Sequence, residues 1–196
     1  LGCGGRVERD LPCRYISSSC CFSCTIFSGP LFFPFLLKGK SRMPVAIMAM
    51  GIVFNLLNGM MQAGGLFYFA PEGLYADGWA YLLKPHALLG IILFFAGMFV
   101  NLHSDYVIRH LRKPGDTKHY LPGKGLYRYV TSANYFGELV EWTGFAILTA
   151  SPAAWVFVWW TFANLVPRAD AIHRRYREEF GDEAVGKRKR IIPFLY

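Results

Sequence analysis

The sequence predicts an all-α protein, a polytopic membrane helix bundle with about four transmembrane helices. Two observations lead to this prediction. Apolar residues make up 54% of the 196 residues and charged residues only 17%, whereas a soluble domain usually contains about 25% charged residues. In addition, several apolar runs approach the roughly 20 residues that a helix needs to cross a bilayer. A soluble globular domain is therefore disfavoured.

Four apolar segments are the expected transmembrane helices, and they cover residues 44–69, 80–102, 132–150 and 153–166. The second segment is the strongest of the four, because the third contains two carboxylates and the fourth is short. The string GLYADGW, residues 73–79, predicts a turn between the first two segments. An earlier apolar stretch, residues 31–37, is too short to span and is interrupted by Pro34.

The net charge of +8 gathers in clusters beside the apolar segments. Three basic residues lie just ahead of the first segment, Lys38, Lys40 and Arg42. Residues 103–131 hold six basic and two acidic side chains, and residues 168–190 hold eight basic and five acidic ones. Basic loops thus alternate with loops that are not basic, as the positive-inside rule expects. This alternation supports the four segments jointly and predicts that the basic loops are cytoplasmic. It fits a membrane protein better than a nucleic-acid footprint.

The first 30 residues differ from the rest of the chain. All five cysteines lie within the first 24 residues, and the string CCFSC lacks the second ligand pair of a zinc site, so we predict no metal site. Residues 1–30 are expected to be an atypical, poorly ordered segment, and residues 31–196 to form the membrane domain. No G-x-G-x-x-G or phosphate-loop motif occurs, so a nucleotide would have to bind through polar groups inside a helical bundle.

Polar side chains inside a membrane segment are costly and are functional hypotheses by default. In the third segment, Asn134, Glu138, Glu141 and Trp142 fall on one helical face, at i, i+4, i+7 and i+8. A ligand site would explain them. The alternative is that a carboxylate pairs with a neighbouring Arg or Lys and holds helices together.

The end of the second segment carries a second polar stripe. Asn101 and Asp105 are four residues apart, and Arg109 and Arg112 continue the same face if the helix continues. We expect a function for Asn101 and Asp105, which lie nearest the bilayer, and a solvated helix end for Arg109 and His110. Lys113-Pro114-Gly115 is expected to end this helix. The basic loop that follows is equally consistent with closure over a phosphate-bearing ligand and with a plain cytoplasmic loop.

Basic and aromatic side chains follow the fourth segment. They are Arg168, His173, Arg174 and Tyr176. Arginine binds phosphate in a bidentate manner, which suits a polyanionic ligand. A juxtamembrane basic segment that holds anionic lipid explains the same residues, and this stretch alone leaves both interpretations open.

Three strings together resemble the steroid 5α-reductase family, the 3-oxo-5α-steroid 4-dehydrogenases. They are NLHSDYVIRHLRKPG (residues 101–115), LPGKGLYRYVTSANYFGELVEWTGFA (121–146) and KRKRIIPFLY (187–196). The resemblance covers about residues 31–196 and implies a seven-helix membrane enzyme with NADPH in the cytoplasmic half of its bundle. It implies reduction of the Δ4 double bond of 3-oxo steroids, with hydride added at the enone β-carbon. The membrane would be the endoplasmic reticulum in a eukaryote or the inner membrane in a bacterium.

The resemblance also implies which residues form the site. The cofactor contacts that it assigns are Asn101, Asp105, Arg112, Tyr120, Asn134, Glu138, Arg168, His173 and Tyr176. Trp142 matches a position at the junction of nicotinamide and steroid, and His119 aligns about as well as Tyr120. The chemistry agrees, because arginines suit the phosphates of NADPH. Amides and carboxylates suit its ribose hydroxyls and carboxamide.

The resemblance places about three further helices ahead of residue 31, with an acidic residue and a tyrosine that polarise the enone carbonyl. Residues 1–30 match neither, so we expect this catalytic pair to be missing and steroid reduction to be impaired in this chain. The alternatives are an enoyl-CoA or sterol reductase of the same superfamily, a methyltransferase using S-adenosylmethionine, and a non-catalytic membrane or lipid-binding remnant. The expected partners are a steroid or other lipophilic enone and membrane lipid, not nucleic acid.

Overall fold

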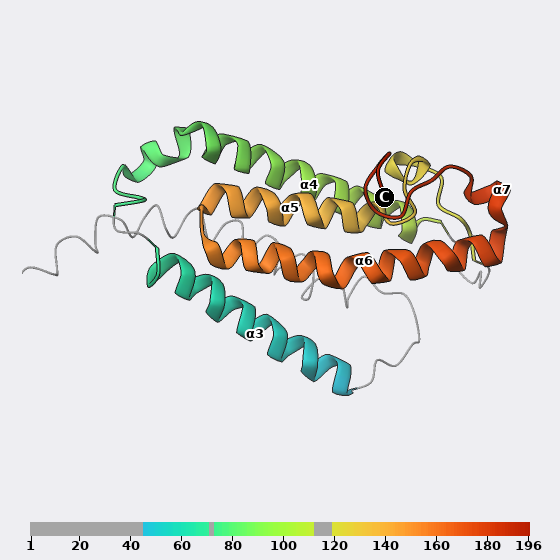
Figure 1. Ribbon diagram of the computed structural model, residues 1–196, viewed down its shortest axis with the longest axis horizontal. Helices are drawn as coiled ribbons and strands as arrows, with labels where there is room; N and C mark the ends of the chain where they lie inside the picture. The colour runs from blue at the N-terminus through green and yellow to red at the C-terminus, as the bar shows by residue number, and fades with distance from the viewer. Residues whose placement is uncertain (1–44, 71–72, 112–118) are drawn as a thin grey trace, which may run out of the picture. The chain divides into compact units, whose positions relative to one another are not determined.

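The computed structural model describes residues 45–70, 73–111 and 119–196 (Figure 1). Within these ranges the chain forms helices and turns without a strand, and an isolated bridge pairs Val130 with Lys189. The all-α prediction is confirmed for this part of the chain. The predictions for residues 1–44, for Arg112 and for the helix stop at Lys113-Pro114-Gly115 lie outside the described residues.

Four long helices correspond to the four predicted segments. They are α3 (Val45–Phe67), α4 (Pro85–Arg109), α5 (Ala133–Thr149) and α6 (Pro152–Phe180). Three short elements accompany them, the 3₁₀ helices η2 (Gly78–Leu83) and η3 (Gly125–Arg128) and the single turn α7 (Asp182–Val185). The predicted turn after the first segment is present at Gly73–Asp77.

Two helices have other boundaries than the predicted apolar segments. The second segment was expected to begin at residue 80, but η2 occupies Gly78–Leu83 and α4 begins at Pro85, because proline is favoured at the first position of a helix, where its missing N–H is not needed. The fourth segment was expected to end at residue 166, whereas α6 continues to Phe180. The basic and aromatic residues after Arg168 therefore lie on a helix.

Helix α4 is the one helix in the described ranges that is long and apolar enough to cross a membrane, with a mean hydropathy of 1.9. Residues Ile52–Phe67 of α3 form a shorter apolar helix. Along one stripe of α4 the large side chains of Ile92, Phe95 and Phe99 are exposed, and an outward-facing apolar stripe suits lipid better than water. These features agree with the predicted membrane helix bundle.

The chain divides into two compact units, and the first contains Leu1–Leu88 together with Ala146–Ala154. Within this unit, α3 packs closely on the turn that follows α5. A Cβ added at Gly65 would lie 2.6 Å from the Cβ of Ala153, and Gln62 donates a hydrogen bond of 3.3 Å to the carbonyl of Ala153.

The last turn of α5 belongs to the same unit and meets two buried tyrosines. The hydroxyl of Tyr75 donates to the carbonyl of Thr149, and the hydroxyl of Tyr81 donates to the carbonyl of Leu148 at 2.8 Å. The last carbonyls of a helix have no partner within the helix. The two tyrosines therefore provide donors to carbonyls at the buried end of the helix.

The second unit contains Leu89–Phe145 and Trp155–Tyr196, and in it α5 lies between α4 and α6 (Figure 1). Glycines spaced seven residues apart form a seam between α4 and α5, with Gly90 and Gly97 on α4 and Gly137 and Gly144 on α5. A Cβ added at Gly137 would lie 2.5 Å from the backbone nitrogen of Asn101. Small residues allow this close backbone approach between membrane helices.

The opposite side of α5 packs on α6 and on the end of the chain. A buried core there consists of Leu139, Leu165, Ala169 and Ile191. Further along the same contact, the ring of Trp142 meets the ring of Phe157 edge-on, with centroids 4.4 Å apart. The first part of α5 is thus held on both sides, which fixes the residues that it carries.

Candidate functional site

The glycine seam brings the polar end of α4 to the beginning of α5. Because the backbone of Asn101 touches Gly137, Asp105, one turn further along α4, comes beside Asn134, one turn earlier on α5. A side-chain hydrogen bond joins Asp105 and Asn134. Helical spacing in the sequence groups Asp105 with Asn101 on α4, and Asn134 with Glu138 on α5. The structure shows in addition that these two polar faces meet.

Glu138 extends this cluster by one turn of α5. Its carboxyl interacts electrostatically with Asp105, with Glu141 and with the guanidinium of Arg168 on α6. Arg168 also interacts electrostatically with the phenol of Tyr135. The same phenol interacts electrostatically with Glu138 and Asp105. Three helices of one unit therefore converge on a polar cluster. We call Asp105, Asn134, Tyr135, Glu138 and Arg168 the α5 cluster.

Tyr127 contacts the α5 cluster through its hydroxyl. It sits on η3, packs in a buried core with Val107, Val130 and Ala133, and its hydroxyl donates to Asn134 Oδ1 at 3.4 Å. Burial, followed by the negative charge of Asp105, raises the pKa of the Tyr127 phenol above its ordinary value. The phenol is therefore protonated at neutral pH and acts as a donor.

The turn that carries Tyr127 begins at Gly125. This residue has a φ of +59°, a left-handed conformation that favours glycine. A Cβ at this position would also lie 2.7 Å from Cε1 of His103. The positive φ is the stronger reason for glycine here, since the exposed His103 ring could move aside.

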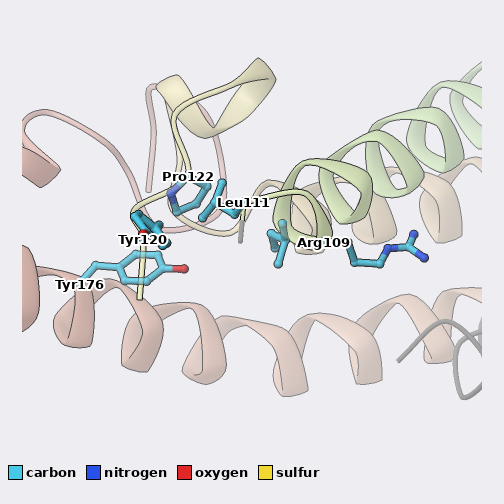
Figure 2. A pocket seen from close by; sticks show the side chains of 6 residues that line it. Arg109, Leu111, Tyr120, Pro122 and Tyr176 are labelled. Atoms are coloured by element: carbon cyan, nitrogen blue, oxygen red, sulfur yellow. The ribbon is translucent and has the colours of Figure 1, made fainter. Parts of the chain in front are cut away.

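A pocket of about 340 Å³ opens at the end of α4 in the same unit, and it is lined by Ile108, Arg109, Leu111, Tyr120, Pro122 and Tyr176 (Figure 2). Figure 2 shows Tyr120 and Tyr176 next to each other, while the guanidinium of Arg109 points away from them. Arg109 is exposed at the end of α4, as expected for a solvated helix end, and its side chain also lines this pocket.

The loop that carries Tyr120 is attached on both sides. His119 Nδ1 lies 2.6 Å from Glu179 Oε1 on α6, and Arg188 donates to the carbonyl of Pro122 at 2.7 Å. His119 and Tyr120 aligned equally well in the sequence. In the structure His119 binds Glu179, and Tyr120 lines the pocket.

His173 lies apart from the contacts that join the α5 cluster. It is buried, with 7% of its surface exposed, and its Nδ1 is 3.3 Å from the hydroxyl of Thr131. Burial lowers its pKa below the ordinary value, and the nearby positive charges of Arg190 and Arg177 act in the same direction. These contacts tie α6 to the start of α5, and a cofactor role for His173 remains a prediction.

The remaining predicted residues are accounted for as follows. Asn101 is half-buried at the seam, Arg168 is exposed on α6, and Trp142 is buried against Phe145 and Phe157. Tyr127 and Tyr135 were missed. Both stand in the string that carries the resemblance, but neither falls on the predicted polar face, so the spacing gave no signal for them.

Residues 41–196 match the model of a protein family described as 3-oxo-5-alpha-steroid 4-dehydrogenase. The chain belongs to this family. The resemblance predicted from the sequence is thereby confirmed, and with it membership of a family of steroid-reducing oxidoreductases.

Individual relatives agree with this membership. The chain is 43% identical over 166 residues to 3-oxo-5-alpha-steroid 4-dehydrogenase 1 of Macaca fascicularis, which covers 85% of this chain and 61% of the relative. The human protein of the same name gives 43% over 166 residues, with 85% and 62% covered. Steroid 5-alpha-reductase DET2 of Arabidopsis thaliana gives 36% over 162 residues, with 81% and 59% covered. The chain spans about three fifths of the length of these relatives.

Proposed function

We propose that this chain forms the cofactor-binding part of an NADPH-dependent reductase that saturates the Δ4 double bond of 3-oxo steroids. The observation that carries the proposal is the convergence of Asp105, Asn134 and Glu138 with Arg168 where three helices of one unit meet. The steroid substrate is supported by the relatives, which are named for this activity and are up to 43% identical.

The chemistry of these residues fits a nicotinamide nucleotide. An amide and two carboxylates can bind ribose hydroxyls and a carboxamide, because they offer acceptors and an N–H donor together. In the pocket, the rings of Tyr120 and Tyr176 add flat apolar surface suited to a base. When bound, NADPH supplies the hydride that the enone β-carbon accepts.

The chain's own residues hold this site in place and keep it dry. The seam fixes the spacing of α4 and α5, so Asp105 and Asn134 are positioned before a ligand arrives. Trp142 packs between Phe145 and Phe157 and forms an aromatic wall one turn beyond Glu138. Such a wall excludes water from the place where a hydride would be transferred.

We further propose a multi-pass membrane protein with this site on the cytoplasmic side, in the endoplasmic reticulum of a eukaryote or the inner membrane of a bacterium. The basic stretches that follow α4 and the apolar half of α6 support this orientation. A steroid or similar lipophilic enone would reach the site through the lipid, and membrane lipid would cover the exposed apolar stripe of α4.

The test is a reductase assay in membranes. The chain, alone and joined to the N-terminal helices of the human relative, is incubated with NADPH and a Δ4-3-oxo steroid, and the products are identified by mass spectrometry. We expect the 5α-reduced steroid from the joined protein and less from the chain alone, because the resemblance assigns the carbonyl-polarising pair to positions ahead of residue 31.

Parallel reactions contain an enoyl-CoA, a sterol, or S-adenosylmethionine with an acceptor. Turnover of one of these without steroid reduction would transfer the assignment to that reaction. Absence of NADPH oxidation with every substrate would contradict the reductase proposal.

A further inference from the structure

Tyr127 is buried in a way that packing alone does not explain. Only 1% of its surface is exposed, and its ring fills a core between the end of α4, represented by Val107, and the start of α5, represented by Ala133. A phenylalanine would fill the same core. The hydroxyl needs a partner when it is buried; it donates to the side-chain oxygen of Asn134 and also bonds to the backbone of Asn134.

The hydroxyl and Asp105 together determine how the Asn134 amide is oriented. An ionised carboxylate only accepts hydrogen bonds, so the bond between Asn134 and Asp105 requires the amide N–H to donate. This leaves Asn134 Oδ1 as an acceptor, and the hydroxyl of Tyr127 donates to it. Rotation of the amide by half a turn would place its oxygen against the carboxylate, which would break that bond, and would leave the hydroxyl without the acceptor to which it donates.

We propose that Tyr127 is a positioning residue of the α5 cluster. The hydroxyl of Tyr127 fixes the Asn134 amide, and this amide holds the carboxylate of Asp105. The remaining acceptor sites of Asp105 are thereby directed to a hydrogen-bond donor of the cofactor. A carboxylate has about four acceptor sites, and Asn134 uses one of them. The groups that fit the others are hydroxyls and amide N–H₂, which the ribose and carboxamide of a nicotinamide nucleotide provide. This inference rests on the proposed function.

The surroundings of Tyr127 support a role in the site. Its phenol interacts electrostatically with Asp105, with Tyr176 and with Tyr135. Tyr135 belongs to the α5 cluster and Tyr176 lines the pocket. The phenol is therefore within electrostatic range of both the α5 cluster and the pocket, which belong to one compact unit.

The test removes the hydroxyl and keeps the ring. Wild type and Tyr127→Phe are purified in detergent, and the equilibrium Kd for NADPH is measured by energy transfer from the protein's tryptophans to the nicotinamide. We expect Tyr127→Phe to raise the Kd about threefold to tenfold, which corresponds to the loss of one hydrogen bond. The matched control is Tyr81→Phe, which also removes a buried hydroxyl but one that donates to the carbonyl of Leu148, and its Kd should equal that of wild type.

A double-mutant cycle with Asn134→Ala separates positioning from stability. If the hydroxyl acts through the amide, Tyr127→Phe has no further effect on the Kd once Asn134 is alanine. A threefold to tenfold effect that persists in that background would overturn the proposal. So would a Tyr127→Phe variant that melts at a lower temperature but binds NADPH as tightly as wild type, because the hydroxyl would then serve stability alone.

The same titrations separate this inference from the function on which it rests. Binding by wild type with an unchanged Kd in Tyr127→Phe would overturn the positioning role and leave the proposed function standing. No binding by wild type at millimolar NADPH would overturn both.

Discussion

The two ends of α5 both meet buried tyrosines but use them differently. At the last turn, Tyr75 and Tyr81 donate to the backbone carbonyls of Thr149 and Leu148. At the first turn, Tyr127 donates to the side chain of Asn134, which in turn bonds to Asp105. The last turn is completed by bonds that serve the helix itself. The first turn carries polar side chains that bond to one another, and this difference agrees with the ligand site proposed at the beginning of α5.

The largest effect is expected where the seam holds the beginning of α5 against α4. Gly137→Leu would place side-chain atoms against the backbone of Asn101 and Gly97, since even a Cβ would lie 2.5 Å from one and 2.8 Å from the other. Overpacking of this kind costs about 3 kcal/mol or more when only backbone can move. Thermal unfolding and size-exclusion chromatography in detergent should show little folded protein.

Gly123→Ala is the control for the seam, because a Cβ at Gly123 would have no atom within 4 Å. It should melt like wild type. A Gly137→Leu variant that also melts like wild type would show that the two helices do not approach this closely.

The next effect concerns the carboxylate one turn into α5. Glu138→Ala removes an acceptor from the α5 cluster and leaves Arg168 without one of its carboxylate neighbours. Loss of a hydrogen bond to a charged group costs about 1.5–3 kcal/mol, so the Kd for NADPH should rise about tenfold or more. Titration by tryptophan energy transfer measures this. Glu183→Ala, on the exposed turn α7, should bind NADPH normally, and an unchanged Kd in Glu138→Ala would make Glu138 a structural partner of Arg168.

At the other end of α5 the prediction is reversed. Tyr81→Phe leaves the buried carbonyl of Leu148 without its donor, and the free energy of unfolding should fall by about 1 kcal/mol with no change in NADPH affinity. Urea unfolding followed by circular dichroism gives the first quantity. Tyr68→Phe, at a strongly exposed tyrosine of the same unit, should change neither. A clear loss of NADPH affinity in Tyr81→Phe would remove the contrast between the two ends.

The smallest effect is a pH dependence that comes from His173. Its pKa is lowered in the folded protein, first by burial and then by Arg190 and Arg177, while in the unfolded chain it is about 6.5. As the pH falls below about 6.5 the unfolded state takes up the proton first, so stability is present above this pH and is lost as the pH falls through the folded-state pKa. The melting temperature of wild type should therefore drop between pH 7 and pH 5, and that of His173→Gln should drop less. His110→Gln, at an exposed histidine, should keep the wild-type dependence, and an identical slope in His173→Gln would contradict the prediction.

Helical periodicity was enough to predict much of the candidate site. Asn101 with Asp105, and Asn134 with Glu138, are each four residues apart, which places them on one face whatever the tertiary structure. Which helix face meets which could not be predicted in this way. The seven-residue spacing of Gly137 and Gly144 marks the face of α5 that forms the seam, but this spacing does not predict which helix packs against that face.

Other features depend on contacts between distant parts of the chain. Tyr127 stands on the short 3₁₀ helix η3. Its contact with Asn134 depends on how η3 packs against α4 and α5, and no local sequence pattern predicts that packing. The start of α4 was misplaced because an apolar run does not distinguish a 3₁₀ turn from an α-helix. The predicted fourth segment covers only the apolar half of α6, and the helix continues past Arg168 with many charged residues.

Hydrogen–deuterium exchange with and without NADPH tests most directly whether the beginning of α5 is the binding end. The chain is exchanged in detergent, digested with pepsin, and compared peptide by peptide at saturating NADPH. We expect slower exchange on binding in residues 119–138, which include Tyr120, η3 and the first turns of α5, and no change in residues 146–154 at the other end. Protection confined to residues 146–154, or no protection in residues 119–138, would contradict the assignment of the cofactor to the beginning of α5.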